Sequence, residues 1–204
     1  MNYFAGAKIV SMKKAYLLLA LCVACFAHVA FAQTLMQAVD KNDTVLALSL
    51  IKAGADVNAP DAQGVAPLLK ACRWNYVGMV KLLLNNGAMV DKPRSKAGRT
   101  ALMVGAAYSA GITVAKILVE HGADVNAKAT DGTTALMLAA KYSKSETVEY
   151  LLAHGADATA FDIQGKNALD YAQIATTRID PAELPDCRID KADCIARLSK
   201  ALGK

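Results

Sequence analysis

The sequence has few of the residues and none of the short motifs on which most enzyme sites depend. Its 204 residues include three histidines and one tryptophan, and aromatic residues make up only 6%. No G-x-S-x-G element, P-loop or dinucleotide-binding fingerprint occurs in it. We therefore expect a protein that is not an enzyme and that uses no cofactor or metal.

A second long apolar run is also missing. The chain is 54% apolar and its mean hydropathy is +0.25, which excludes intrinsic disorder. Because only residues 15–27 form a sustained apolar run, a membrane protein with several spans is excluded too. The formal net charge of +5 would suggest a nucleic acid or an anionic lipid as partner if it were spread over the chain.

Much of this charge and apolar character belongs to the amino-terminal segment 1–32. Three lysines are its only charged residues, the apolar run follows, and an A-x-A element ends at Ala32. This order is typical of a Sec-type signal peptide cleaved between Ala32 and Gln33, with either Met1 or Met12 as the start. Cleavage lowers the formal net charge from +5 to +2, so we expect no nucleic-acid binding and only transient membrane contact during export.

Two alternatives to a cleaved signal peptide stay open. The run could be an uncleaved anchor, although it is no longer than the roughly 20 residues that a span needs and His28 interrupts its far end. A lipoprotein would need small residues together with a leucine before its cysteine, and neither Cys22 nor Cys25 has both.

Three cysteines remain after cleavage. Cys187 and Cys194 are separated by a short stretch of chain, which predicts a local disulfide in an oxidising compartment. Cys72 lies in an apolar helical stretch and is predicted to be a small buried hydrophobic residue.

Internal repeats decide the predicted architecture. A Gly-Ala pair recurs at nearly constant spacing along the chain, beginning at Gly54, Gly87, Gly122 and Gly155. A second glycine recurs with almost the same period, at Gly64, Gly98, Gly132 and Gly165. Each unit predicts two short helices, a glycine in the left-handed conformation where the second helix ends, and a polar turn.

At these residues the sequence resembles the ankyrin-repeat family, most closely over 134–140 and 148–157. The resemblance implies an all-α repeat solenoid, with stacked helix-turn-helix units and β-hairpin tips. About five units would cover residues 33–176, the first of them an N-terminal cap, and residues 177–204 would form a C-terminal capping loop and helix. The histidine of the family's T-P-L-H motif is replaced, so its Thr–His hydrogen bonds are absent; the replacing residues are Leu69, Met103, Met137 and Asp170.

The resemblance also implies a binding surface on the concave face. Trp74, Tyr108 and Tyr142 recur once per repeat unit, at the exposed end of each inner helix, with Arg73 and Lys141 beside two of them. Tryptophan and tyrosine are favoured in binding hot spots, which predicts partner recognition. The alternative is that the rings only staple neighbouring units together.

One hairpin tip is rich in positive charge. It carries Lys92, Arg94, Lys96 and Arg99. These residues could contact an acidic partner, or they could form an ordinary solvated loop.

The remaining polar repeats favour structural roles. His121 and His154 each precede a helix-ending glycine, where a histidine can cap the negative end of the helix dipole. Asp56, Asp124 and Asp157 follow such glycines, where an aspartate stabilises the turn rather than binding calcium.

Together these features predict a non-catalytic, monomeric protein-binding module in the bacterial periplasm, with secretion as the second choice. Small exported ankyrin proteins are known beside peroxide-defence enzymes such as catalase, so the resemblance implies support of such an enzyme as one role. An immunity protein that neutralises a secreted toxin or lipase, or an effector that binds host proteins, is the alternative.

Overall fold

The computed structural model describes residues 35–92, 97–108, 112–174 and 191–203. The predicted signal peptide and Cys187 lie outside these ranges. Residues 35–40 are helical. The helices with defined bounds are α2 (Thr44–Lys52), α3 (Pro67–Arg73), α4 (Val77–Asn85), α5 (Ala101–Tyr108), α6 (Thr113–Glu120), α7 (Ala135–Lys141), α8 (Ser145–Ala153), α9 (Ala168–Ile174) and α10 (Lys191–Ala201).

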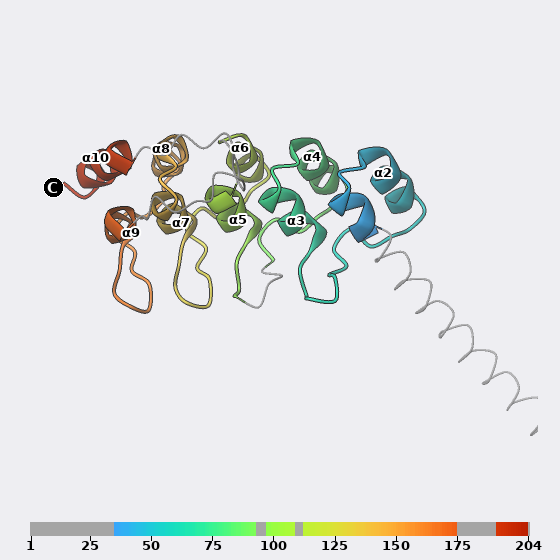
Figure 1. Ribbon diagram of the computed structural model, residues 1–204, viewed down its shortest axis with the longest axis horizontal. Coiled ribbons are helices and arrows are strands. Elements are labelled where there is room, and N and C mark those ends of the chain that lie inside the picture. The colour runs from blue at the N-terminus through green and yellow to red at the C-terminus, as the bar shows by residue number, and fades with distance from the viewer. Residues whose placement is uncertain (1–34, 93–96, 109–111, 175–190, 204) are drawn as a thin grey trace, which may run out of the picture.

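The helices form two parallel rows, which confirms the predicted all-α solenoid (Figure 1). The inner row contains α3, α5, α7 and α9, and each packs against the next. The outer row contains α2, α4, α6, α8 and α10. Helix α10 packs on both α8 and α9, and so takes the place of the outer helix in the last unit.

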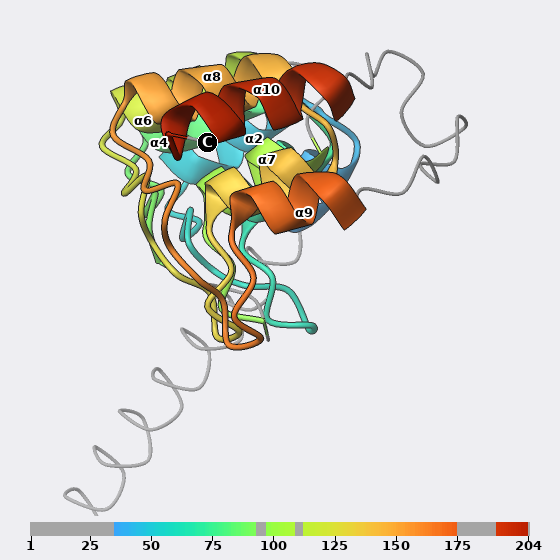
Figure 2. The ribbon, with the colours of Figure 1, turned by 90° about the vertical axis from the view of Figure 1, so that its left-hand side faces the viewer.

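The turns between units project together from the inner row (Figures 1 and 2). They are hairpin-like, but the described residues contain no β-strand. In the last tip, the amide of Asp162 donates to the carbonyl of Lys166 at 3.0 Å. The amide of Ile163 donates to the carbonyl of Asp131 in the preceding tip, also at 3.0 Å, so neighbouring tips are held side by side.

Helix starts follow the local sequence. Pro67 is the first residue of α3, where no backbone donor is needed. The Thr134 hydroxyl accepts from the amide of Met137 at the start of α7. At α9, Asn167 and Asp170 accept from each other's backbone amides at 3.1 and 2.9 Å, a reciprocal cap built on the residue that replaces the family's histidine.

Helix ends are set by the repeated glycines. Gly54, Gly87, Gly122 and Gly155 have φ between +83° and +99°, which confirms the predicted left-handed conformation. Most helices have only seven to nine residues and would be marginal alone, so their stability depends on packing between units.

That packing forms one continuous apolar core. Leu69, Met103 and Met137 are 2%, 0% and 1% exposed, so apolar contacts fill the places where the family has histidine. Three successive outer helices contribute fully buried leucines, which are Leu83, Leu118 and Leu151. Cys72 is also fully buried, as predicted, and burial raises the pKa of its thiol.

A second set of contacts between units lies in the turns that follow the outer helices. The Asn126 amide side chain accepts from the amide of Asp157 at 2.8 Å and donates to the carbonyl of Gly155 at 2.9 Å. One unit earlier, Asp91 accepts from the amide of Asp124 through both carboxylate oxygens, at 3.0 and 3.1 Å. An aspartate has no side-chain proton to donate, so this junction has no counterpart of the Asn126 donor bond.

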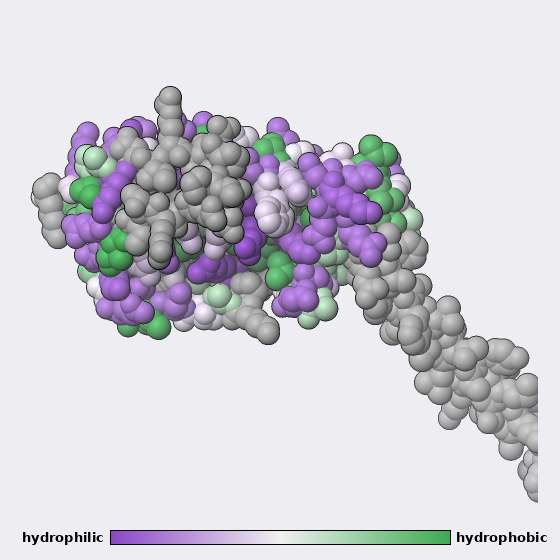
Figure 3. Space-filling view, viewed as in Figure 1, coloured by the Kyte–Doolittle hydropathy of each residue, from purple (hydrophilic) through white to green (hydrophobic). Residues whose placement is uncertain are grey.

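The first unit exposes both polar and apolar side chains. Gln37, Asp40 and Lys41 are exposed, as expected of a cap. Helix α2 also exposes Val45 (79%) and Leu46 (38%), and apolar surface is visible over α2 in Figure 3. No helix among the described residues is both long and apolar enough to cross a membrane.

Candidate protein-binding surface

Three aromatic side chains mark the carboxyl ends of successive inner helices. Trp74 and Tyr142 directly follow α3 and α7, and Tyr108 is the last residue of α5. Their spacing of one repeat therefore places them in equivalent positions of adjacent units. The Trp74 side chain is 56% exposed, whereas Tyr108 and Tyr142 are half-buried.

The two tyrosines are in direct contact. Their ring centroids lie 5.5 Å apart at an interplanar angle of 45°. Burial and the donation of its hydroxyl proton to Tyr108 raise the pKa of Tyr142 to about 12. Burial also acts to raise the pKa of Tyr108, but the bond from Tyr142 and the charges of Arg99 and Arg73 outweigh it and lower that pKa.

Arg73 connects Trp74 to this pair. Its guanidinium carbon lies 5.9 Å from the centre of the Trp74 ring and 5.2 Å from that of Tyr108. At the other end, the Lys141 ammonium lies 5.9 Å from the Tyr142 ring. These distances are within the range of cation–π attraction, so the five side chains form a continuous surface, here called the aromatic band.

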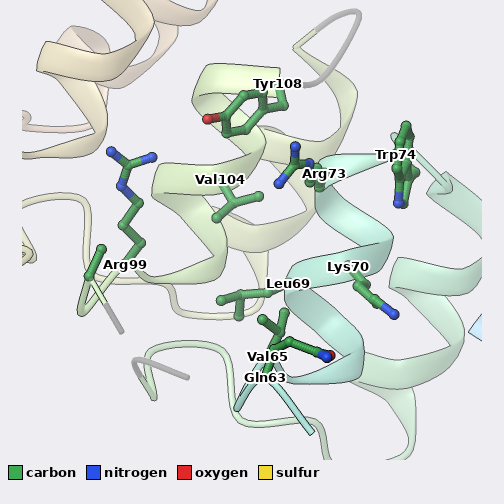
Figure 4. Close-up of a pocket in the computed structure, with 10 residues that line it drawn as sticks. Gln63, Val65, Leu69, Lys70, Arg73, Trp74, Arg99, Val104 and Tyr108 are labelled. Carbon is green, nitrogen blue, oxygen red and sulfur yellow. The ribbon is translucent and has the colours of Figure 1, made fainter. Parts of the chain in front are cut away.

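A groove of about 520 Å³ runs between α3 and α5, from two hairpin tips to the aromatic band (Figure 4). Its apolar lining includes Leu69 and Val104, which are 2% and 8% exposed, and the half-buried Val65. Trp74 lines the same groove. Its volume is in the range typical of sites that enclose several side chains or a small molecule.

The residues of the predicted basic tip do not all lie in the same kind of position. Lys92 is exposed, while Arg94 and Lys96 lie outside the described residues. Arg99 is half-buried, lines the groove and hydrogen-bonds to Tyr108. Of the two alternatives for this tip, contact with an acidic partner or a solvated loop, the position of Arg99 in the groove differs only from the second.

Two ankyrin-repeat family models match the chain, one of three repeat copies over residues 35–129 and one of many copies over residues 118–172. Together they cover most of the described units.

The chain belongs to the ankyrin-repeat family.

Similar proteins come from distant organisms. An ankyrin repeat protein of fowlpox virus, FPV031, is 35% identical over 136 residues, or 65% of this chain and 40% of its own length. An ankyrin repeat-containing protein of Treponema pallidum is 34% identical over 61% of this chain and 41% of its own length. Human BCL-6 corepressor-like protein 1 is 36% identical over 56% of this chain and 6% of its own. The matched region therefore spans at most about two fifths of these relatives.

Ankyrin repeats are protein-interaction modules, and their concave face is formed here by the inner helices and the tips. The sequence did not identify Lys70 as part of this face, although it precedes Arg73 by nearly one helical turn. Its ammonium lies 2.8 Å from Asp40 and 3.5 Å from Asp61, and these two carboxylates hold it at the edge of the groove.

The ankyrin histidines have the predicted structural role. The Nδ1–H groups of His121 and His154 donate to the carbonyls of Ile117 and Tyr150, each at 2.8 Å. Each ring thus gives a second hydrogen bond to a carbonyl in the last turn of α6 or α8 that already accepts from the backbone amide of the same histidine.

The repeated aspartates also stabilise turns. The carboxylates of Asp56 and Asp124 each accept from the backbone amide two residues later at 2.9 Å. Asp157 accepts in the same way from Thr159 at 2.8 Å. Among the described residues, no group of three histidine, cysteine, aspartate or glutamate side chains is placed to hold a metal.

Proposed function

We propose that this chain is a non-catalytic binding protein that recognises a protein partner through the aromatic band and the groove between α3 and α5. The exposure of the Trp74 side chain is the main support for this proposal. Its large ring is 56% exposed at the end of an apolar groove, in the region where successive ankyrin units expose their inner helices. Covering such a ring with a partner buries a large apolar area at little cost in conformational entropy.

The aromatic band divides into a recognition end and a structural end. Tyr108 and Tyr142 pack against each other across a repeat boundary, so removing either ring weakens the stack. Trp74 makes no ring contact of this kind among the described residues and is approached by Arg73. We therefore assign partner recognition mainly to Trp74 and Arg73.

Affinity capture tests this assignment. The full chain, purified after export, serves as bait for a periplasmic extract, beside the variants Trp74→Ala and Phe161→Ala. Phe161 is the matched control, because it is 54% exposed but belongs to the last hairpin tip. We expect Trp74→Ala to lose the captured protein and Phe161→Ala to retain it, with unchanged melting temperatures. Retention of the captured protein by Trp74→Ala would contradict the proposal.

We further propose that the protein works in the periplasm after export. The support is the sequence of residues 1–32, with its positive start, short apolar run and A-x-A end. Cell fractionation should recover the chain in the periplasm with its amino terminus at Gln33, whereas recovery mainly from the culture medium would refute this location. The identity of the captured protein then separates support of an oxidative-stress enzyme from neutralisation of a toxin.

A further inference from the structure

The charged side chains that line the groove are all positive. Among the described residues they are Lys70, Arg73 and Arg99, and no carboxylate of that part of the chain lines the groove with them. The charge of Lys70 is already balanced by Asp40 and Asp61. The electrostatic character of the groove therefore depends mainly on the two arginines on either side of Tyr108 (Figure 4).

Arg73 lies beside two aromatic rings. It is exposed, and no carboxylate of the described residues lies within 4.0 Å of its guanidinium. The rings of Trp74 and Tyr108 lie within cation–π distance of its guanidinium and restrict its side chain. A planar guanidinium held in this way can bind a carboxylate through two parallel hydrogen bonds, with little further loss of side-chain entropy.

The lining beside Arg73 is apolar. Leu69 and Val104 face the groove from α3 and α5, and Trp74 lies at its end (Figure 4). A bound segment thus meets an apolar surface and a cation together. Polar groups without an apolar neighbour would leave this lining in contact with water, and apolar groups alone would leave the guanidinium partly desolvated and unpaired.

We propose that the groove binds an extended polypeptide segment in which an aspartate or glutamate stands beside an apolar side chain. The carboxylate pairs with Arg73, and the neighbouring apolar side chain packs against the exposed Trp74 ring at the end of the groove. This inference rests on the proposed function and specifies the chemistry of the partner at the same site.

Selection from a random-peptide display library provides an unbiased test. The full chain is the target, and binders that also bind Trp74→Ala are removed. We expect the enriched peptides to carry an acidic residue next to an apolar one. Trp74 is the single tryptophan of the chain, so binding can be followed directly as a blue shift of its emission. Raising the salt concentration should weaken binding, because a charged pair at a partly exposed site is screened.

Variants of Arg73 separate charge from packing. Arg73→Gln should weaken the selected peptides about 10- to 100-fold, the amount expected for one lost charge-assisted contact. Arg73→Lys should keep the preference for acidic peptides over their amide versions, although with lower affinity. Lys81→Gln, on the outer helix α4, is the matched loss of one exposed positive charge and should change nothing. Melting temperatures show whether any variant has lost its fold.

The outcomes distinguish this inference from the proposed function. Peptides that need Trp74 but are neutral or basic would overturn the acidic chemistry and leave the groove as a binding site. Acidic peptides that bind Arg73→Gln as well as the original chain would also overturn it. No enriched peptides at all would refute the binding of a segment here, while capture of a folded partner through Trp74 would still stand.

Discussion

Asp91→Asn should stabilise the protein, because Asp91 is the one residue at its repeat position that cannot donate a side-chain hydrogen bond in the described units. Asn126 accepts from Asp157 and donates to Gly155, at 2.8 and 2.9 Å. Asn58 makes the same pair of bonds with its own neighbouring unit. At Asp91 only the accepting half exists, made by both oxygens with Asp124.

The size of the effect follows from these contacts. An asparagine at position 91 keeps one bond from the Asp124 amide and gains a donor for the carbonyl of Gly122. A new bond of this kind contributes about 1 kcal/mol, and losing the charge on the acceptor removes part of that gain. We expect a net increase of about 0.5–1 kcal/mol in the free energy of unfolding. For a chain of this size this raises the melting temperature by about 1–4 °C.

Urea unfolding at constant m-value measures this change, with Asn126→Asp as the reciprocal control. Asn126→Asp loses the donor bond to Gly155 and should cost about 1 kcal/mol. If Asp91→Asn lowers the urea midpoint while Asn126→Asp leaves it unchanged, the contacts between units do not contribute as described.

Three further changes test the packing of the units. Tyr142→Ala should lower the free energy of unfolding by about 1–2 kcal/mol in urea, because it removes a half-buried ring that packs on Tyr108 across a repeat boundary. An unchanged urea midpoint would show that the ring does not hold the two units together. Gly132→Ala should destabilise the chain more than Gly165→Ala in the same assay. Both glycines have positive φ, but of the two only a Cβ at position 132 would come within 3.0 Å of the Asp162 backbone. Equal losses of stability would contradict this close approach. The free energy of unfolding should fall as the pH rises from 10 to about 12. Burial and the 2.8 Å bond to Asp162 raise the pKa of Tyr171 to about 12 in the folded state, whereas the unfolded tyrosine ionises near 10. Tyr171→Phe should reduce this alkaline loss when unfolding is measured against pH.

The repeat architecture could be predicted because it depends on local rules applied at a fixed spacing. A glycine with positive φ ends each of the outer helices α2, α4, α6 and α8. The repeat spacing places an aromatic residue at the carboxyl end of three successive inner helices. The alignment of Trp74, Tyr108 and Tyr142 follows from that spacing alone. The fold class could therefore be predicted without knowing which distant residues are in contact.

The groove could not be predicted because facing residues of different units create it. Leu69 and Val104 read as ordinary core positions in the sequence, and only the distance between α3 and α5 leaves space above them. The position of Arg99 was missed for a related reason. Its place in a charged loop predicted either a contact with an acidic partner or a solvated residue, and did not predict that its guanidinium hydrogen-bonds to the Tyr108 hydroxyl on the neighbouring helix.

The predicted Cys187–Cys194 disulfide stays a prediction. Cys194 is fully buried in α10, and Cys187 lies outside the described residues. Mass mapping without reducing agent should find the two residues linked in protein purified from the periplasm.

Site-specific photo-crosslinking in living cells tests the central claim, that the inner-helix face binds the partner, most directly. A photoreactive residue is placed at position 74 on the groove, or at position 81 or 116 on the outer helices α4 and α6. Lys81 and Lys116 are exposed, so a partner can reach these positions too. We expect one discrete adduct from position 74 and none from positions 81 and 116. An adduct from the outer helices without one from position 74 would contradict it.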